Sequence, residues 1–430
     1  MNIAVIGLGH TGLVAAAVLA EVGHQVIGHD IESEKCAIIR RGNSPFHEPG
    51  LEGLINRGRQ SGRLAVADSL EESLAGAEVI FLAVGTPAAN GDSPNLAEFW
   101  SAAGQVVPAA PKNAILAIKS TLPVGTTDKL ISRFKSIWPG EAPVVVVPEF
   151  LRQGSAVADF RRPDRVVLGS HSPEARATVR RVFELFDLPT AIFHECTPMA
   201  AELIKHATNC FLATKISFAN ELANLCGHLG VDYEVIRRGL AADTRIGAGF
   251  MHAGLGFGGS CFPKDVAALI ETGRKAECRL TLLETALVAN RAQVKRVVDL
   301  IRDILGEIKG KKILQLGLTY KPGTDDIRGS LSLELAFLLS RGGADLTCYD
   351  PAYQSTAVGS DNLFDLADDP LPAAVGAELI IIATDWPQFG ELPWSEIAKS
   401  MKVANLLDGR NMLNPQKLDT AGFTYRGIGR

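Results

Sequence analysis

Residues 2–30 read NIAVIGLGHTGLVAAAVLAEVGHQVIGHD. The apolar run at 2–6 predicts a strand, and the apolar residues beyond Gly12 predict a helix that continues to about Val22. Gly23 is suited to end that helix, and a second strand at 25–28 leads to Asp30. A strand, a glycine-rich turn, a helix and a second strand form a βαβ unit, which indicates a Rossmann-like, doubly wound α/β domain.

The glycines and the acid of this unit predict a dinucleotide site. Gly7, Gly9 and Gly12 let the backbone approach a pyrophosphate at the N-terminus of the helix, where the helix dipole favours negative charge. Asp30 is spaced to accept hydrogen bonds from the adenosine ribose and to repel a 2′-phosphate. We therefore expect NAD rather than NADP. A glycine-rich turn without a ligand is the alternative, and the surrounding strand, helix and acid make it the weaker one.

Further apolar runs at 79–84, 114–118 and 144–147 predict strands whose ends carry polar residues. Thr86, Thr121 and Glu149 stand just after these three runs. Because the carboxyl ends of parallel strands share one edge of a sheet, we expect these side chains to line the same crevice as the glycine turn, although each alone could serve as a turn or cap residue. Two more strands, expected at 165–169 and 191–194, extend this domain to residue 196.

The middle of the chain combines two long helical patterns, at 198–229 and 281–305, with a glycine-rich stretch around one cysteine. Residues 254–265 read GLGFGGSCFPKD, so Cys261 directly precedes a helix that we expect to start at Pro263. The helix dipole and Lys264 both favour the thiolate, and Asp265 is a candidate base. A buried structural cysteine is the alternative.

Two polar residues interrupt the apolar pattern of the first long helix. Lys205 and Asn209 are four residues apart and therefore project from the same side. A cation and an amide donor in these positions can stabilise developing negative charge. The alternative is that both residues simply belong to a solvent-exposed polar face of the helix.

From residue 311 the opening pattern returns. A strand at 313–317, a helix at 331–340 and a strand that ends at Asp350 indicate a second doubly wound domain, and strands at 377–383 and 403–407 continue it. The loop at 317–328 lacks the dinucleotide pattern and offers Lys321 and Arg328 instead, which suits a second phosphate-bearing ligand. Two nucleotide-type domains thus flank one helical segment.

Composition excludes several classes of protein. With 430 residues, 47% hydrophobic content and a net charge of −5, the chain is a multidomain globular protein without the basic footprint of a nucleic-acid binder. Its seven cysteines are scattered and include no CxxC pair, which argues against a disulfide framework and a metal site and for a reducing compartment. No basic segment precedes the first strand and no long apolar run occurs, so we expect neither a signal peptide nor a membrane span, and a cytoplasmic location.

Over nearly its full length the chain resembles the UDP-glucose/GDP-mannose dehydrogenase family. The matching motifs, in chain order, are Gly7-x-Gly9-x-x-Gly12, Glu48-Pro-Gly-Leu51, Val84-Gly-Thr-Pro87, Lys119-Ser-Thr121, Pro148-Glu-Phe-Leu151, Gly256-Phe-Gly-Gly-Ser-Cys-Phe-Pro-Lys-Asp265, Lys321-Pro-Gly-Thr-Asp-Asp-x-Arg328 and Asp408-Gly-Arg-Asn411. The chain departs from the family pattern at His10 and Thr11, where an aromatic residue and valine are usual, at Val147, where asparagine is usual, and at Gln153, where glutamate is common.

The resemblance implies three parts: an NAD-binding Rossmann domain at 1–196, a central helical segment at 197–308 that carries the cysteine loop and the dimer contact, and a UDP-sugar-binding domain at 309–430. It also implies two successive oxidations of a sugar-nucleotide CH2OH by NAD, through a Cys261 thiohemiacetal and thioester. In that mechanism Lys205 and Asn209 stabilise oxyanions, and Asp265, Glu149 and Thr121 orient or deprotonate water.

The resemblance further assigns contacts to each ligand. The cofactor contacts are Gly7, Gly9, Gly12, Asp30, Lys35, Thr86, Thr121, Gln153, Lys264 and Arg328. The substrate contacts are Glu149, Phe150, Leu151, Arg152, Lys205, Asn209, Arg245, Phe250, Met251, His252, Ala253, Gly254, Gly258, Lys321 and Arg410. Arg245 would reach the sugar from a neighbouring subunit, which implies a homodimer or a higher homo-oligomer.

Several alternatives stay open. The Arg245-Ile-Gly stretch favours UDP-glucose, oxidised to UDP-glucuronate, but GDP-mannose and UDP-N-acetylhexosamine members share most of the motifs. A one-step dehydrogenase would give Cys261 no role. A protein that binds nucleotides without catalysis would keep the fold as a scaffold.

Overall fold

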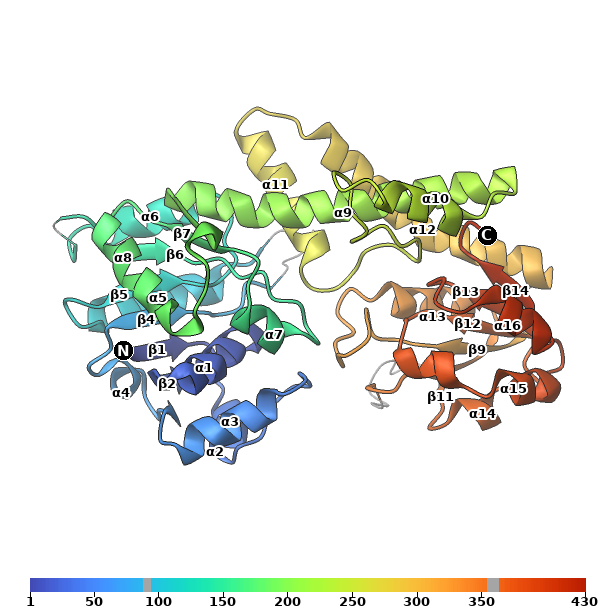
Figure 1. Cartoon of the computed structure of the whole chain (residues 1–430), viewed down its shortest axis with the longest axis horizontal. Helices are drawn as coiled ribbons and strands as arrows, with labels where there is room; N and C mark the ends of the chain where they lie inside the picture. Colours follow the sequence, from blue (N-terminus) through green and yellow to red (C-terminus); the bar gives the residue numbers. More distant parts are fainter. Residues whose placement is uncertain (88–93, 139, 354–362) are drawn as a thin grey trace. The chain divides into compact units, whose positions relative to one another are not determined.

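The computed structural model of the chain describes residues 1–87, 94–138, 140–353 and 363–430. These residues form two compact units, Met1–Thr208 with Ala267–Glu277 and Asn209–Val266 with Cys278–Arg430. Each unit is built on a sheet covered by helices, as Figure 1 shows, which confirms the expected α/β class with two doubly wound domains and a central helical segment. The division at residues 197 and 309 stays a prediction.

The first unit contains an eight-stranded sheet among the described residues, in the order β3-β2-β1-β4-β5-β6-β7-β8. Its strands are β1 (Asn2–Ile6), β2 (Gln25–His29), β3 (Leu64–Val66), β4 (Val79–Leu82), β5 (Ile115–Ile118), β6 (Val144–Val146), β7 (Val166–Gly169) and β8 (Phe193–Cys196). All neighbours are parallel except β6 and β7, which are antiparallel. The strand expected from 191 starts at Phe193, because Thr190–Ile192 form a 3-10 turn.

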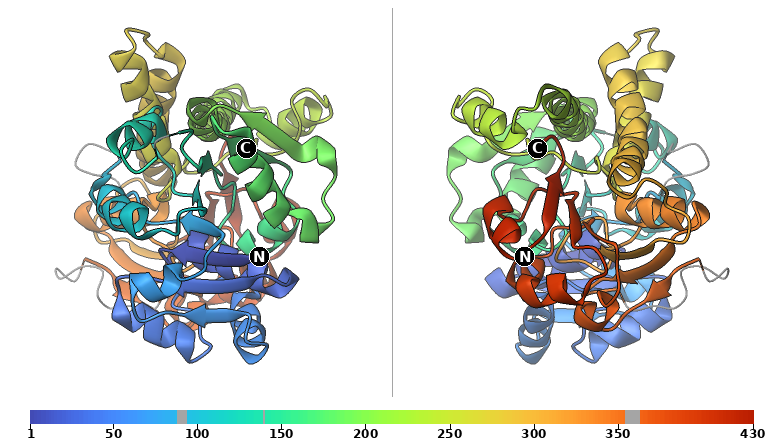
Figure 2. Two further views of the ribbon diagram at one scale, coloured as in Figure 1. Left: turned by 90° about the vertical axis from the view of Figure 1, so that its left-hand side faces the viewer. Right: turned by 90° about the vertical axis from the view of Figure 1, so that its right-hand side faces the viewer.

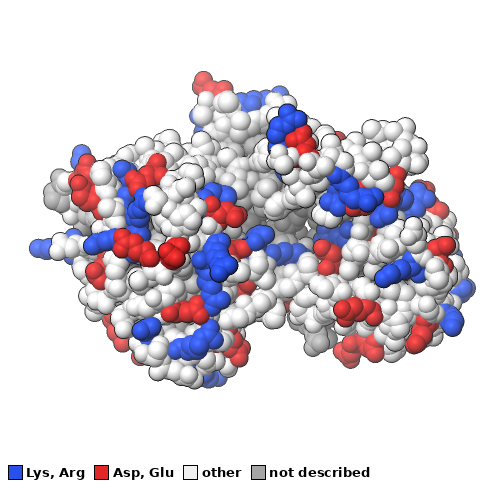
Figure 3. All heavy atoms as spheres, viewed as in Figure 1, with Lys and Arg blue, Asp and Glu red and all other residues white. Residues whose placement is uncertain are grey.

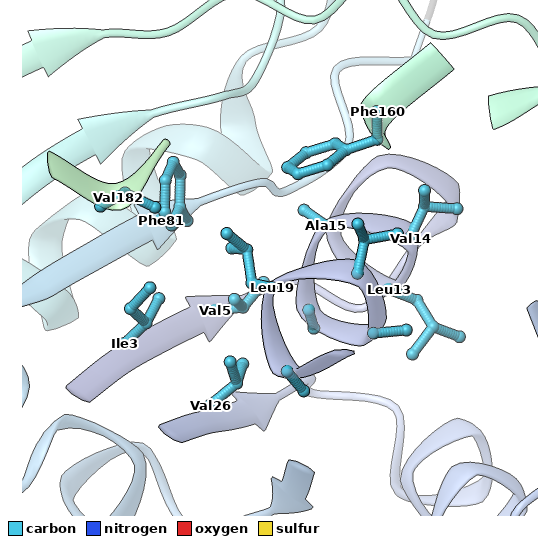
Figure 4. Packing of buried hydrophobic residues seen from close by; sticks show 14 of the residues in the cluster. Ile3, Val5, Leu13, Val14, Ala15, Leu19, Val26, Phe81, Phe160 and Val182 are labelled. Carbon is cyan, nitrogen blue, oxygen red and sulfur yellow. The ribbon is translucent and has the colours of Figure 1, made fainter. Parts of the chain in front are cut away.

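Helices cover both faces of this sheet because its strands are apolar on both sides. Ile3 and Val5 pack on α1 (His10–Val22), α3 (Leu51–Gln60), α7 (Ala156–Arg161) and α8 (Pro173–Val182), while Ala4 and Ile6 face α4 (Leu70–Leu74), α5 (Ala97–Ala109) and α6 (Thr126–Arg133). Figure 4 shows Leu19 of α1 packed beside Val5 of β1, with Val26 of β2 nearby. The remaining helix, α2 (Ser33–Arg40), follows β2.

The second unit contains a six-stranded sheet among the described residues, in the order β11-β10-β9-β12-β13-β14 and parallel throughout. Its strands are β9 (Lys312–Leu316), β10 (Asp345–Tyr349), β11 (Asp365–Leu366), β12 (Leu379–Ile382), β13 (Asn405–Asp408) and β14 (Thr424–Gly427). The order β10-β9-β12-β13 repeats the order β2-β1-β4-β5 of the first unit, so the internal similarity expected from residue 311 onward is confirmed.

Helices also cover both faces of the second sheet. One face packs on α12 (Thr281–Leu305) and α13 (Leu331–Arg341), and the other on α14 (Pro370–Ala373), α15 (Trp394–Ser400) and α16 (Pro415–Thr420). In Figure 2, right, these last three helices appear in red and orange beside the C-terminal strands.

The central helices are α9 (Pro198–Leu229), α10 (Tyr233–Ala241) and α11 (Phe262–Lys275). The predicted bounds of α9 and α12 are confirmed. Helix α11 starts at Phe262, one residue before the expected Pro263, so Pro263 occupies the second helical position, where its missing N–H also costs no helix hydrogen bond.

The surface carries mixed charge. On the face drawn in Figure 3, Lys and Arg side chains alternate with Asp and Glu over each unit. Among the described residues, no helix has the length and apolar character needed to cross a membrane.

Candidate active site

The turn between β1 and α1 requires glycine at two positions. Gly7 has a φ of +92°, and its N–H donates to the carbonyl of His29 at 2.8 Å. A Cβ at Gly12 would lie 1.8 Å from the carbonyl oxygen of Gly7, a distance no side chain tolerates. Gly9 is the residue before α1. The first N–H groups of α1 therefore stand open to an anion, as a pyrophosphate-binding turn needs.

Asp30 closes this turn from the end of β2. Its Oδ2 accepts from the N–H of Leu8 at 2.7 Å and from Nζ of Lys35 at 3.1 Å. The expected acid of the ribose site is thus fixed beside the glycine turn, and Lys35 contacts it directly. These groups fit NAD as the sequence predicted.

The ends of β4 and β5 meet, as expected for one edge of a parallel sheet. Oγ1 of Thr86 donates to the carbonyl of Thr121 at 3.0 Å, and Oγ of Ser120 donates to the carbonyl of Val84 at 2.7 Å. Thr86 and Thr121 therefore share the edge at which the glycine turn also lies.

A buried ion pair joins the end of β6 to α9. Nζ of Lys205 lies 2.8 Å from Oε1 of Glu149, and the other carboxylate oxygen of Glu149 accepts from the N–H of Leu151 at 2.6 Å. Burial raises the pKa of Glu149, but the Lys205 ammonium, the N–H of Leu151 and the Lys119 ammonium together outweigh burial and leave that pKa below its usual value. Glu149 is thus held as a carboxylate within a low-dielectric site.

Beside this pair lies a cavity of about 120 Å³ whose lining includes Lys119, Phe150, Phe160 and Arg165. The Arg165 guanidinium stacks 3.7 Å from the centroid of the Phe150 ring, and the buried Lys119 ammonium lies 5.3 Å from that of Phe160. Burial lowers the pKa of Lys119 to about 8. Sequence reasoning missed Lys119 and Arg165 as site residues; a lysine at the end of an apolar strand was the available signal.

Sequence reasoning also missed a second contact of α9. Glu202 accepts from the N–H groups of Gly125 and Thr127, at 2.6 and 2.8 Å, and from Oγ1 of Thr127 at 2.6 Å. His206 contacts the carbonyl of Leu122 at 2.9 Å. Both side chains therefore fix the loop that follows Thr121. Burial raises the pKa of Glu202 to about 7.

In the second unit, Asp265 is the centre of a buried network. Oδ2 of Asp265 accepts from Nδ2 of Asn209 at 2.6 Å, and Oδ1 accepts from Nζ of Lys264 at 2.7 Å. All three side chains are almost fully buried. The structure therefore brings together three of the predicted residues. The positive charge of Lys264 is paired with the carboxylate of Asp265.

Cys261 is exposed and directly precedes α11. Its carbonyl accepts from the N–H of Asp265 at 2.9 Å, and its sulfur lies 3.8 Å from Oγ of Ser260. The thiol thus stands at the positive end of a helix dipole, accessible to a reactant, as the sequence predicted.

The segment 250–259 is held close to its neighbours in the second unit. Gly254 N–H donates to Asn220 at 2.8 Å, and a Cβ at Gly258 would lie 2.2 Å from the carbonyl oxygen of Gly329. Tyr233 donates its O–H to the carbonyl of Met251 at 2.8 Å. Glycine is therefore required where this segment meets the loop that precedes α13.

Arg410 connects this segment to the loop after β9. Its Nε donates to the carbonyl of Ala383 at 2.9 Å and its Nη2 to that of Tyr320 at 3.3 Å. A Cβ at Gly254 would lie 3.3 Å from Nη1 of Arg410. The predicted substrate residues Gly254, Arg410 and, next to Tyr320, Lys321 therefore lie around one region of the second unit.

Other predicted residues have partners outside these clusters. The guanidinium of Arg245 pairs with Asp243 at 2.6 Å while its side chain is 87% exposed, and Arg152 and Arg328 pair with Asp159 and Asp326. The rest lie in the chain segments already described: Leu151 and Gln153 after β6, and Phe250, His252 and Ala253 before the cysteine loop. No group of three or more His, Cys, Asp or Glu residues in the described ranges is arranged to hold a metal ion.

Comparison with family models covers most of the chain. Residues 1–187 match the NAD binding domain of the UDP-glucose/GDP-mannose dehydrogenase family, residues 199–292 its central domain, and residues 314–415 its UDP binding domain.

Similar proteins match over the full length. UDP-glucose 6-dehydrogenases of Pseudomonas aeruginosa and Rhizobium meliloti are 39% and 38% identical, covering 100% of this chain and 98% and 100% of those proteins. The solved structure of a UDP-glucose dehydrogenase from the archaeon Pyrobaculum islandicum is 37% identical, with a TM-score of 0.90, covering 100% of this chain and 97% of that one.

Proposed function

Because this chain belongs to the UDP-glucose/GDP-mannose dehydrogenase family, we propose that it oxidises the C6 hydroxymethyl group of UDP-glucose twice, with NAD, and releases UDP-glucuronate. The relatives named above are UDP-glucose 6-dehydrogenases or a UDP-glucose dehydrogenase, which favours this substrate over GDP-mannose and UDP-N-acetylhexosamines. The observation that carries the proposal is the exposed Cys261 next to the buried network of Asp265. A one-step dehydrogenase has no need of such a nucleophile.

NAD, when bound, supplies the hydride acceptor for both oxidations. The residues of the first unit that would hold it are Gly7, Gly9 and Gly12 at the pyrophosphate, and Asp30 with Lys35 at the ribose. Thr86, Thr121, Gln153, Lys264 and Arg328 are the proposed further contacts of the cofactor.

Cys261 is the proposed nucleophile. Its thiolate adds to the carbon of the aldehyde that the first oxidation leaves, which gives a thiohemiacetal. The second oxidation converts this adduct into a thioester, and water then cleaves the carbon–sulfur bond, so that the carboxylate leaves and the thiolate is restored. Covalent capture also keeps the reactive aldehyde from escaping.

The proposed roles of the remaining polar residues follow from their charge. Lys205 and Asn209, four residues apart on α9, would donate to the oxyanion of each tetrahedral species. Glu149, held as a carboxylate, and Asp265 would orient or deprotonate the hydrolytic water, with Thr121 as a further contact. Lys205 and Asn209 each already donate a hydrogen bond to a buried carboxylate, so little reorganisation is needed when charge develops.

The nucleotide half of the substrate is proposed to bind the second unit. Arg410 and Lys321 would contact the diphosphate, because a guanidinium and an ammonium suit phosphate oxygens. The other proposed contacts are Phe250, Met251, His252, Ala253, Gly254 and Gly258, together with Glu149, Phe150, Leu151 and Arg152 for the sugar. The match of residues 314–415 to a UDP binding domain supports this assignment.

A homodimer is the proposed assembly. Phe211, Phe218 and Leu225 are exposed on α9 at intervals of seven residues, which leaves an apolar stripe of the kind that pairs with a second helix. A second copy of this chain offers the same stripe, and it would also bring an exposed Arg245 to the partner's substrate. Light scattering on the purified chain should give twice the chain mass, and Phe218→Glu should give the monomer; a monomeric wild type would overturn the assignment.

Two further proposals accompany this one. The chain divides at about residues 196 and 308, close to the limits of the three family models. The cytoplasm is its proposed location, because all seven cysteines are free.

The test of the proposed function is the number of NADH released per sugar nucleotide consumed. UDP-glucose, GDP-mannose and UDP-N-acetylhexosamines are compared side by side with the wild-type chain. Two NADH per UDP-glucose are expected, with much slower turnover of the others. One NADH per sugar would refute the thioester route, and no NADH with any of them would favour a protein that binds nucleotides without catalysis.

A further inference from the structure

Glu48 belongs to a sequence motif for which the proposed mechanism has no use, yet its carboxylate is buried and fully engaged. It is 5% exposed and accepts three hydrogen bonds. One comes from Nε2 of His10 at 2.8 Å, and two come from the backbone N–H groups of Gly154 and Ala156, at 2.7 and 2.8 Å. Three hydrogen bonds restrain this carboxylate in different directions, so the carboxylate holds the segments that supply its donors in fixed positions.

The donors come from two functional segments of the first unit. His10 is the first residue of α1, at the end of that helix where the pyrophosphate of NAD is expected. Gly154 and Ala156 directly follow the 149–153 loop, which carries Glu149 and Gln153. Glu48 lies in neither segment and connects them.

The ring of His10 has a second contact. Its centroid lies 5.2 Å from that of Phe46, two residues before Glu48, and the side chain is only partly exposed. The ring is therefore held by packing on one side and by the hydrogen bond to Glu48 on the other, which fixes the first turn of α1 in a single position.

We propose that His10 and Glu48 are a positioning pair that sets the affinity for NAD by tying the first turn of α1 to the 149–153 loop. The proposal rests on the dinucleotide site of the proposed function. It adds two residues that position this site without contacting the atoms that react.

Two variants of His10 and one of Glu48 test the pair. His10→Leu removes the donor to Glu48. His10→Tyr keeps an aromatic ring against Phe46 and supplies an O–H that can donate to the carboxylate. Glu48→Gln keeps the shape but loses the charge and one acceptor. The matched control is His171→Leu, which breaks an exposed pair of the same chemistry, His171 with Asp128 at 2.8 Å, on residues without a proposed role.

The experiment is calorimetric titration of the full chain with NAD and, separately, with UDP-glucose. His10→Leu should raise the Kd for NAD roughly tenfold or more, as expected for loss of one hydrogen bond to a charged group, and leave the Kd for UDP-glucose within about twofold. His10→Tyr should restore most of the NAD affinity, Glu48→Gln should weaken it at least as much as His10→Leu, and His171→Leu should change neither constant.

Three results would overturn the proposal. The first is an unchanged Kd for NAD in His10→Leu. The second is equal weakening for both ligands, which would mean general loosening of the fold. The third is failure of His10→Tyr to restore affinity while its melting temperature matches the wild type.

Should His10→Leu not fold, His10→Asn takes its place. Its shorter amide cannot reach Glu48, so the same weakening of NAD binding is expected. A wild type that binds NAD but releases no NADH would refute the proposed function and leave this inference standing.

Discussion

The ammonium of Lys205 lies 2.8 Å from the carboxylate of Glu149, and both side chains are buried. The two residues are far apart in sequence, one on α9 and the other after β6, so only the tertiary structure makes them partners. A buried ion pair is tolerated as a pair but costs free energy when one member is removed, because the other charge is left without compensation.

Lys205→Met should therefore abolish turnover and destabilise the first unit by about 3 kcal/mol, the usual cost of a broken buried pair. Lys205→Arg keeps the charge and should retain most of the stability while losing much of the activity, because the planar guanidinium cannot take the place of the ammonium. Thermal melts and initial rates check both. A Met variant as stable as the wild type would contradict the importance of the pair.

Asp265→Asn should lower kcat by roughly a hundredfold or more. The carboxylate accepts from both Asn209 and Lys264, and an amide would point an N–H group at one of these two donors. Steady-state kinetics measures the loss, with Asp303→Asn on the exposed side of α12 as the control. Normal kcat in Asp265→Asn would exclude a role for the carboxylate in water activation.

Cys261→Ser should stop the second oxidation while the chain still binds UDP-glucose. A serine hydroxyl at the same helix N-terminus is not ionised at neutral pH, so it adds to an aldehyde far more slowly than a thiolate. Calorimetry should give a Kd for UDP-glucose within about threefold of the wild type. Near-normal turnover to the acid would mean that the thiol is structural.

Gly12→Ala should eliminate measurable NAD binding and lower the melting temperature. The new Cβ would overlap the carbonyl oxygen of Gly7, which cannot move without opening the turn. Gly104→Ala on α5 is the matched control, because its Cβ meets no atom within 4 Å. Alanine there should be neutral or stabilise by up to about 1 kcal/mol. Unchanged NAD affinity in Gly12→Ala would place the dinucleotide elsewhere.

Glu202→Gln should change how stability depends on pH. Burial raises the pKa of Glu202 from 4.5 to about 7, so the folded state takes up a proton that the unfolded state releases. The stabilisation is complete below about pH 4.5 and is lost as pH rises through about 7, an effect on the order of 3 kcal/mol. The melting temperature of the wild type minus that of Glu202→Gln should therefore fall between pH 5 and pH 7.5 and level off above. A constant difference would mean that the carboxyl does not titrate in this range.

Local sequence determined much of this architecture. The glycines of the first turn, Asp30 and the helix that Gly23 ends follow from backbone sterics and periodicity, which act within a few residues. The bounds of α9 and α12 and the position of Cys261 before a helix were predicted for the same reason. Neither the 3-10 turn at Thr190–Ile192 nor the start of α11 at Phe262 was foreseen, since helix ends depend on small local energies.

Partners across the fold could not be predicted. The sequence indicated that Lys205, Glu149, Asn209 and Asp265 could take part in the chemistry. It did not predict that Lys205 pairs with Glu149 or that Asn209 pairs with Asp265. Glu202 and Arg165 were missed, because nothing in their local pattern distinguishes a buried polar side chain from a solvated one, and Lys119 was noted within a motif but given no role.

The sequence by itself therefore determined the elements, the two nucleotide-type domains and the position of Cys261, the proposed nucleophile, before a helix, because these depend on short-range sterics, periodicity and capping. Only the tertiary structure decided which charges are paired, which carboxyl groups have shifted pKa values, and that Glu48 links His10 to the loop after β6. Burial and hydrogen bonding between distant segments set those properties, and they exist only once the sheets and helices have packed.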